Sequence, residues 1–517
     1  MAEVSRTARV LQNARVALIF YCINLFLQFF SRKIFLDYLG AELLGLNTTT
    51  QNLVQFLNLA ESGIGAAVAF ALYKPLIQGS RNEIIEIVSL LGWFYRWVGF
   101  LVITGSLVLM AFFPWIFAKA QVPLIYAYGT FVAFLISALL GYFVNYKIIV
   151  LSADQKEYKI TVETQGIKVI KVFFQMIVIW KLPHGYAWWI AIEVLAAIAT
   201  SIRLHISVNK EYPWLKSKLS ESGELKVKYS FVLEKVKQLF FHKISEYAFW
   251  LTTPLIVYCF TTLTVVAIYG NYVTIMGGCL ALVDAFSRGF NAGVGNLVAQ
   301  GDKRLIRKTF LEIITVRVFM AGMLSTGIYL LSESFVSLWV GYQYLMPDVP
   351  MLLMTLIYFV QMSRSSDFFL RAYGLFQDIW APILECSLNI VLSILFGFFW
   401  GLSGILFAVL LSQILIVLCW KIYFLCSHGF KEPVRYYLIA YIKKIMLLLC
   451  TFFSVRYVFD CMHFEIKNYL DWIKAGGVII FSFSVVGVFL FTSFDENFRS
   501  IMNKIFARLR GNLNHTR

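Results

Sequence analysis

The chain has 517 residues, of which 60% are hydrophobic, 17% aromatic and 14% charged. Soluble domains carry about 25% charged residues, so this composition excludes a multidomain soluble enzyme. In a soluble chain the net charge of +16 would indicate a nucleic-acid or acidic partner. In a chain this apolar, the charge instead marks the sides of a bilayer, and no nucleic-acid partner is expected.

Apolar segments long enough to cross a membrane recur along the whole sequence. A helix needs about 20 apolar residues to span a bilayer, because every backbone polar group must be satisfied within the segment. The predicted spans are 14–34, 43–72, 84–112, 122–150, 160–180, 186–207, 240–268, 271–299, 311–339, 347–373, 379–399, 402–426, 439–459 and 470–493. The sequence therefore predicts an all-α, polytopic membrane protein with about fourteen transmembrane helices. The first span is too long for a cleavable signal peptide, so none is expected.

Lysine and arginine accumulate in the cytoplasmic loops of membrane proteins. With the N-terminus in the cytoplasm, few of the 45 basic residues fall in predicted outer segments, namely Lys119, Lys181, Arg456, Lys467 and Lys474. An even number of spans returns the C-terminus to the same side. We expect a multi-pass protein of the inner (cytoplasmic) membrane with both termini in the cytoplasm.

The longest loop divides the predicted spans into two sets of six. This basic linker, 209–238, separates an N-lobe, 1–208, from a C-lobe, 239–428. Segment 429–493 adds two further helices. The tail, 494–517, places apolar residues on one helical face and arginine and lysine elsewhere, which predicts a basic amphipathic helix on the inner membrane surface.

A weak internal repeat relates the two sets of six spans. A shift of 230 residues places Gly40 on Gly270 and Gly63 on Gly293. Transporters often bind substrate between two related halves, so the match predicts a parallel repeat. The alternative is a coincidence of small residues that ease helix packing.

A stripe of polar residues runs along the second predicted span. Its members recur every three or four positions and therefore share one helical face: Asn47, Gln51, Gln55, Asn58 and Ser62. The first span continues the pattern at Asn24 and Gln28, and the eighth at Asp284, Arg288 and Asn291. These stripes predict a water-filled cavity between the two halves. The alternative is interhelical hydrogen bonding without a substrate.

Cations at membrane depth are costly, so they indicate where function should be sought. Arg288 lies roughly 26 Å from the outer end of its predicted span, which makes it the best candidate for binding an anion. Arg32 and Arg96 also fall within spans. Three other cations lie near predicted inner ends, where their side chains are expected to reach the headgroups: Arg317, Lys168 and Lys171.

Carboxylates within the spans leave two interpretations open. Asp284 precedes Arg288 by four residues and Asp367 follows Arg364 by three, spacings that favour pairs along one helix face. Such pairs are either structural or part of a proton or cation site. Three further carboxylates are candidates for the second role: Glu61, Glu193 and Glu385.

No motif indicates enzymatic chemistry. The eight cysteines are scattered without metal-ligand spacing, and the sequence has no phosphate-binding glycine loop, zinc-protease motif or nucleophile elbow. We expect no metal, no cofactor and no enzymatic activity. Coupling to an H⁺ or Na⁺ gradient or to the membrane potential stays open.

Several short elements together resemble one family. They are Ser31-Arg32 at the outer end of the first span, Leu39-Gly40, Gly45-Leu46, His242-Lys243, Tyr269-Gly270-Asn271-Tyr272 and Gly295-Asn296. With the 6+6+2 arrangement, they resemble the polysaccharide transporter branch of the multidrug/oligosaccharidyl-lipid/polysaccharide (MOP) exporter superfamily, the Wzx-type flippases.

This resemblance implies two six-helix lobes forming a V, with two appended helices. It implies that a polyprenyl-diphosphate-linked oligosaccharide, a repeat unit of a surface polysaccharide such as lipopolysaccharide O-antigen, moves from the inner to the outer leaflet by alternating access. Arg32, Arg288 and Arg96 would bind the diphosphate, and membrane lipids and polysaccharide polymerase machinery would be partners. Relatives carry an aspartate where this chain has Thr253 followed by Pro254, which puts cation coupling at that position in doubt.

Two other functions stay open at this point. An ion-coupled multidrug or small-molecule exporter of the same superfamily would favour acidic and aromatic cavity residues over arginines. A polytopic glycosyltransferase or polymerase would need acidic catalytic residues on the outer face, where only Asp460, Glu465 and Asp471 cluster. Which glycan is carried and whether the chain forms oligomers do not follow from the sequence.

Overall fold

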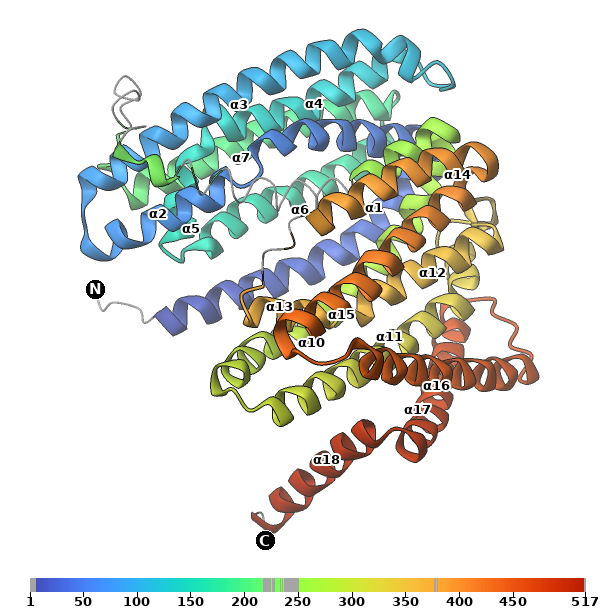
Figure 1. The fold of residues 1–517 in the computed structure, drawn as a ribbon. Coiled ribbons are helices and arrows are strands. Elements are labelled where there is room, and N and C mark those ends of the chain that lie inside the picture. The colour runs from blue at the N-terminus through green and yellow to red at the C-terminus, as the bar shows by residue number, and fades with distance from the viewer. Residues whose placement is uncertain are drawn as a thin grey trace. The chain divides into compact units, whose positions relative to one another are not determined.

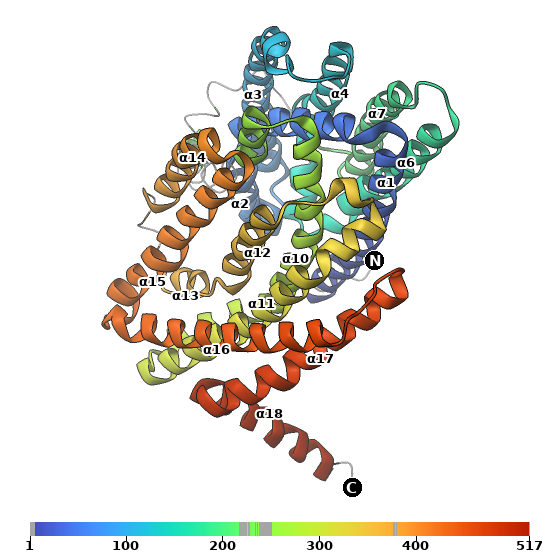
Figure 2. The ribbon, with the colours of Figure 1, turned by 90° about the vertical axis from the view of Figure 1, so that its right-hand side faces the viewer.

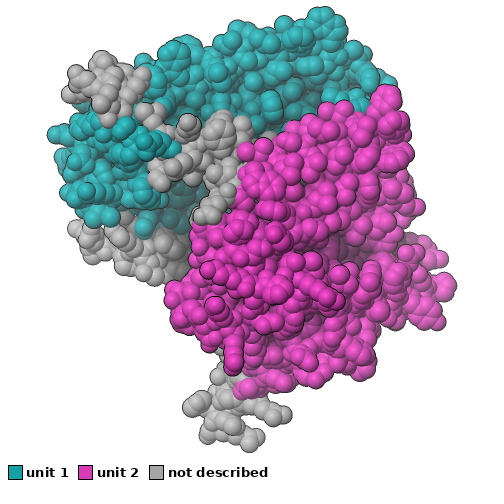
Figure 3. Space-filling view, viewed as in Figure 1, with its two compact units in different colours: residues 1–267 teal, residues 268–517 magenta. Residues whose placement is uncertain are grey.

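A computed structural model gives the fold, and it describes residues 6–216, 225, 228–232, 234, 236, 251–375, 378 and 380–515. Within these residues, the side chains of 6–11, 288, 289, 291, 292, 505 and 508–515 lie outside the description. The described part is almost entirely helical and contains no strand, which confirms the predicted all-α class. The chain forms two compact units, residues 1–267 and 268–517 (Figure 3).

The first unit, unit 1, is built from long helices joined by short turns (Figure 1). They are α1 (Arg6–Leu57), η1 (Asn58–Glu61), α2 (Ile64–Gln78), α3 (Arg81–Ile116), α4 (Leu124–Phe143), η2 (Asn145–Ile148), α5 (Ile149–Ala153), α6 (Glu157–Lys181) and α7 (Gly185–Glu211). The start of α10 (Leu263–Gln300) also belongs to this unit. Helix α6 packs against α1 and α7, and α4 packs against α3 and α7.

The second unit, unit 2, continues from the remainder of α10. Its elements are α11 (Lys303–Trp339), η4 (Tyr342–Tyr344), α12 (Asp348–Ser363), α13 (Ser366–Ala372), α14 (Trp380–Gln413), η5 (Ile414–Trp420), α15 (Lys421–Phe424), η6 (Leu425–Phe430), α16 (Val434–Cys461), α17 (Tyr469–Phe494) and α18 (Glu496–His515). Helices α16 and α17 form a hairpin that packs on α11 (Figure 2).

Unit 1 extends past the predicted linker, 209–238, to Ala267. The predicted lobe boundaries are not tested by this division and stay predictions. Much of the linker, and the His242-Lys243 element, lie outside the described residues.

Within the described residues, nine helical stretches are long and apolar enough to cross a membrane. Two of them each cover more than one predicted span: Gln12–Glu61 covers 14–34 and the first part of 43–72, and Trp380–Phe430 covers nearly all of 379–399 and 402–426. The longer stretch bends where Gly401 has a φ of 54°, in the gap predicted between 379–399 and 402–426. The chain is therefore a multi-pass membrane protein. Helix α6 is not among the nine, because charged residues interrupt its apolar run.

The second predicted span, 43–72, is not one continuous helix. Helix α1 ends at Leu57, a 3₁₀ turn follows at Asn58–Glu61, and α2 begins after Gly63. Gly63 has a φ of 92°, a left-handed conformation that glycine adopts without steric cost. Gly293, its counterpart in the proposed repeat, lies inside the continuous α10, so the repeat does not extend to this break.

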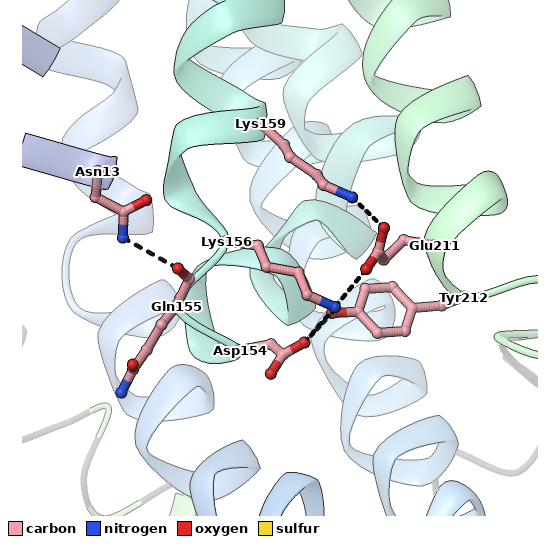
Figure 4. Close-up of polar contacts among 7 residues, drawn as sticks. All are labelled: Asn13, Asp154, Gln155, Lys156, Lys159, Glu211 and Tyr212. Carbon is pink, nitrogen blue, oxygen red and sulfur yellow. Dashed lines mark hydrogen bonds and ion pairs between the residues drawn. The ribbon is translucent and has the colours of Figure 1, made fainter. Parts of the chain in front are cut away.

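A polar cluster at one end of unit 1 ties α6 to α7 (Figure 4). The Lys156 ammonium lies 2.7 Å from an Asp154 carboxylate oxygen and also pairs with Glu211. Lys159 pairs with the second oxygen of Glu211, and the Tyr212 hydroxyl donates to Asp154 at 2.7 Å. Burial opposes the charged form of Lys156, but the hydrogen bonds and attraction from these carboxylates outweigh burial and raise its pKa.

Helix α1 is fastened to the same turn through one side chain. Asn13 donates from Nδ2 to the Gln155 carbonyl at 3.0 Å and accepts at Oδ1 from the Tyr158 backbone N–H at 2.8 Å. Because this amide is satisfied at both ends, it fixes α1 to the start of α6. The cluster thus joins α1, α6 and α7, three of the helices that line the cavity described next.

Candidate functional site

A polar cavity of about 490 Å³ lies within unit 1, lined by α1, α4, α6 and α7. The polar and charged residues around it are Gln28, Ser31, Arg32, Asn47, Thr48, Gln51, Gln55, Asn58, Ser137, Lys171, Gln175 and Glu193. Gln28 also lines a second cavity of about 460 Å³, and Gln55 and Asn58 line a third of about 300 Å³. Three polar cavities that share wall residues therefore follow the polar stripes of α1.

Arg32 is the arginine of this cavity. Its side chain is half-buried and donates from Nη2 to the Ala267 carbonyl at 3.0 Å, so the guanidinium is held by the start of α10. A guanidinium has five N–H donors in a fixed planar arrangement. A planar guanidinium binds anions such as phosphate in bidentate fashion, which makes Arg32 a candidate anion-binding residue.

A lysine–carboxylate pair stands on the α6–α7 side of the cavity. The Lys171 ammonium lies 2.7 Å from Glu193 Oε1, and their side chains are 19% and 10% exposed. Gln175 donates to Glu193 Oε2 at 2.9 Å. Glu193 is therefore neutralised locally by Lys171.

The amides of the α1 stripe differ in how they are held. Asn47 is 7% exposed and accepts at Oδ1 from the Tyr186 hydroxyl at 2.7 Å. Tyr186 in turn lies 2.6 Å from the Thr130 hydroxyl. Gln51 and Gln55 are exposed and line the cavity. The stripe thus combines an amide fixed by the protein with two that are accessible to a ligand.

The helix break between α1 and α2 places a carboxylate beside two tyrosines. Tyr95 donates from its hydroxyl to Glu61 Oε1 at 2.6 Å, and Tyr142 donates to Asn58 Oδ1 at 2.9 Å. Glu61 and Asn58 also line the third cavity, together with Ser62. The break brings the last residues of the stripe and Glu61 to one place.

Other residues proposed from the sequence are not among the described residues that line this cavity. Asn24 donates to Gln165 at 3.0 Å and lines the second cavity. Arg96 is exposed on α3 and lines none of these three cavities. Asp284 is exposed on α10. Arg288 and Asn291 lie on α10 as well, but their side chains are outside the described part of the chain.

Unit 2 contains a separate cluster of charges at the break between α12 and α13. Arg364 and Asp367 form an ion pair, and the Lys421 ammonium lies 3.0 Å from the same carboxylate. Two cations on one carboxylate give a paired arrangement typical of a structural cluster. The geometry therefore favours the structural interpretation for Arg364 and Asp367.

Two expectations about snorkelling cations are wrong. Lys171 does not extend to the headgroups but pairs with Glu193 and lines the cavity. Arg317 is 3% exposed and donates to the Met362 carbonyl and the Ser287 hydroxyl, both at 2.9 Å. The predicted spans put both residues near a helix end. The helices themselves begin before those spans, at Glu157 and Lys303, so both residues lie further from the helix ends than predicted.

No protein-family model matches the sequence, and no curated protein matches it either. The fold, however, is similar to solved structures. A structure of the lipid II flippase MurJ, in an inward closed conformation, matches with a TM-score of 0.65 over 92% of this chain and 99% of that chain, at 14% identity. An inward-facing multidrug resistance transporter of the MATE family, of the MOP superfamily, matches with a TM-score of 0.57 over 78% of this chain and 93% of that chain, at 12% identity. At such identities the likeness shows that this chain shares its fold with these two proteins.

Proposed function

We propose that the protein is a flippase that moves a polyprenyl-diphosphate-linked oligosaccharide from the cytoplasmic to the outer leaflet by alternating access. The observation that carries the proposal is the cavity of unit 1, where Arg32 stands beside exposed amides within a fold shared with a lipid II flippase. Both similar structures are of a flippase or a transporter, which favours transport over catalysis.

The chemistry of the cavity fits the three parts of such a substrate. Arg32 provides a planar, permanently charged group that binds a phosphate in bidentate fashion. Gln51 and Gln55 provide donors and acceptors for sugar hydroxyls. A polyprenyl tail requires only contact with lipid. The described lining carries two cations, Arg32 and Lys171, and one carboxylate, Glu193, a balance that suits an anionic substrate.

The wider setting follows from the same proposal. A lipid-linked sugar is made at the cytoplasmic face, so the protein would lie in the inner membrane, with its termini in the cytoplasm and with polysaccharide polymerase machinery acting after it. Coupling to an H⁺ or Na⁺ gradient would use a carboxylate such as Glu61, which faces a cavity beside Tyr95.

A multidrug exporter is the second candidate, because the fold is also shared with a MATE transporter. Such an exporter carries organic cations in many instances, and these require unpaired carboxylates or exposed aromatic faces in the binding cavity. In this cavity Glu193 is paired with Lys171, whereas Arg32 would repel a cation. The observed charges therefore favour the flippase.

The test is transport by the purified protein in liposomes. A fluorescent polyprenyl-diphosphate oligosaccharide is placed in both leaflets, and the fraction accessible from outside is measured with time. We expect Arg32→Ala to lower the rate by about 10- to 100-fold, because a hydrogen bond to a charged group contributes ~1.5–3 kcal/mol. Arg32→Lys should restore the rate only in part, since the planar fork is lost.

Arg15→Ala is the matched control, because Arg15 lies on the same helix, is exposed, and does not line the cavity. Arg288→Ala belongs in the same series, because its place in the sequence makes it a second candidate for the diphosphate. Equal rates for the native protein and Arg32→Ala would refute the assignment. Uptake of a cationic dye that Arg32→Ala accelerates would establish the exporter instead.

A further inference from the structure

The start of α18 is anchored by a buried ion pair. The Lys444 ammonium lies 2.6 Å from Asp495 Oδ2, and both side chains are 2% exposed. The other oxygen of Asp495 accepts the backbone N–H groups of Asn497 and Phe498, at 2.8 and 3.1 Å. One carboxylate thus fixes the corner after α17 and caps α18 (Glu496–His515) at its N-terminus.

Helix α18 is also fastened along its length to α11. Glu312 accepts from the Ser500 hydroxyl at 3.1 Å and from the Lys504 ammonium at 2.8 Å. Phe498 is buried, with its ring centroid 5.2 Å from that of Phe319. The first part of the C-terminal helix, through Lys504, is therefore fixed to α11 by these side chains.

A cationic cavity of about 560 Å³ lies where α18 meets α11. Lys308 from α11 and Arg499 and Lys504 from α18 line it, with Glu496 as the carboxylate of the lining. Arg499 donates from Nε to the Thr492 carbonyl at 3.0 Å and from Nη2 to the Ser493 carbonyl at 2.8 Å. These bonds hold its guanidinium in place.

Two exposed aromatic residues lie close in the sequence to residues that line the cavity. Phe494, at the end of α17, is 56% exposed, and Phe506, on α18 next to the lining residue Ala507, is 54% exposed. A free phosphate would use the cations alone. An amphiphile with an anionic head would use the cations and the aromatic rings together.

We propose that this cavity binds the phosphate headgroup of an anionic phospholipid, with the acyl chains lying along Phe494 and Phe506. Lys308 and Arg499, from two helices, attract the headgroup, whereas Lys504 lines the cavity and pairs with Glu312. Basic amphipathic helices such as α18 bind at membrane surfaces. The site is separate from the cavity of unit 1. Its existence does not depend on the proposed substrate.

The test measures lipid retention by the full-length protein in detergent, using native mass spectrometry. Phosphatidylglycerol and phosphatidylcholine with identical acyl chains are compared. We expect preferential retention of phosphatidylglycerol, and we expect Lys308→Gln to weaken that retention by about fivefold, the effect of one interfacial cation. Lys308 is suited to this change because it is exposed on α11, so its loss should not disturb the fold.

Lys303→Gln is the matched control. Lys303 lies on the same helix and is also exposed, but it does not line the cavity, so retention should be unchanged. Equal retention of the two lipids, or equal losses in the two variants, would overturn the proposal. Displacement of phosphatidylglycerol by millimolar inorganic phosphate would also overturn it, because a phosphate alone would then satisfy the site.

Discussion

The Lys171–Glu193 pair is the residue-scale feature whose removal has the clearest expected cost. Glu193 is 8% exposed, and it accepts from both Lys171 and Gln175. In Lys171→Met the carboxylate keeps its burial and loses its counter-charge. Since breaking a buried pair costs about 3–5 kcal/mol and Lys171 is partly exposed, we expect a loss of ~2–3 kcal/mol, measured as a lower midpoint of thermal unfolding in detergent.

Two further variants separate this effect from a general loss of charge. Lys171→Met combined with Glu193→Gln removes both charges and should recover most of the stability. Arg203→Met breaks an ion pair with Glu163 in which the arginine side chain is 57% exposed. Because exposed ion pairs contribute little to stability, this variant should leave the midpoint of thermal unfolding nearly unchanged. If Lys171→Met and Arg203→Met lower the midpoint of thermal unfolding equally, the Lys171–Glu193 pair does not behave as a buried ion pair.

The sequence predicted which residue types gather in unit 1 better than it predicted their partners. Asn47, Gln51, Gln55 and Asn58 recur every three or four residues, so helix geometry alone places them on one face. All four line one cavity. The partner of Lys171 comes from α7, and no local pattern relates the two helices. The predicted position of Arg317 near the end of its span is wrong because its helix begins at Lys303. Arg317 therefore lies roughly 21 Å from the helix start.

At the scale of helices, close packing between α1 and the start of α10 rests on one glycine. A Cβ atom at Gly45 would overlap the carbonyl oxygen of Leu263. Ala267, one turn further along α10, accepts the hydrogen bond from Arg32. We expect Gly45→Ala to cost ~1–3 kcal/mol through overpacking and to lower transport by displacing the carbonyl that holds Arg32. Thermal unfolding and the liposome assay measure the two effects.

Gly141→Ala is the control for Gly45→Ala. Gly141 also lies in a helix of unit 1, but nothing lies within 4 Å of an added Cβ atom there. Alanine has the higher helix propensity, so this variant should be as stable as the native protein or slightly more stable. A similar loss of stability in both variants would show that helix packing at Gly45 is not close.

Helix positions were predictable from apolar runs, but a break inside a run was not. The segment 43–72 is continuously apolar apart from its polar stripe, so length and composition predicted one helix. The structure instead interrupts it at Asn58–Glu61 and Gly63. The sequence does contain the glycine that the left-handed conformation requires, but a single glycine also eases helix packing, and local sequence does not distinguish the two uses.

For the whole molecule, the distribution of charge distinguishes the two ends of the α16–α17 hairpin. Around its connection each cation has a carboxylate nearby: Arg456 lies 3.6 Å from Asp460, Lys467 2.5 Å from Glu465 and Lys474 3.5 Å from Asp471. The opposite end carries an excess of cations, among them Lys431, Arg435, Lys443 and Arg499. The positive-inside rule therefore predicts that the connection faces outward and the C-terminus faces the cytoplasm.

Reporter fusions test this orientation. Alkaline phosphatase inserted between Met462 and Asn468, in the connection between α16 and α17, should be active because the enzyme requires an oxidising compartment for its disulfides. The same enzyme fused after Arg517 should be inactive, whereas a green fluorescent protein at that position should fluoresce. The reverse pattern would place the basic ends of the helices outside. It would also contradict the proposed cytoplasmic location of the C-terminus.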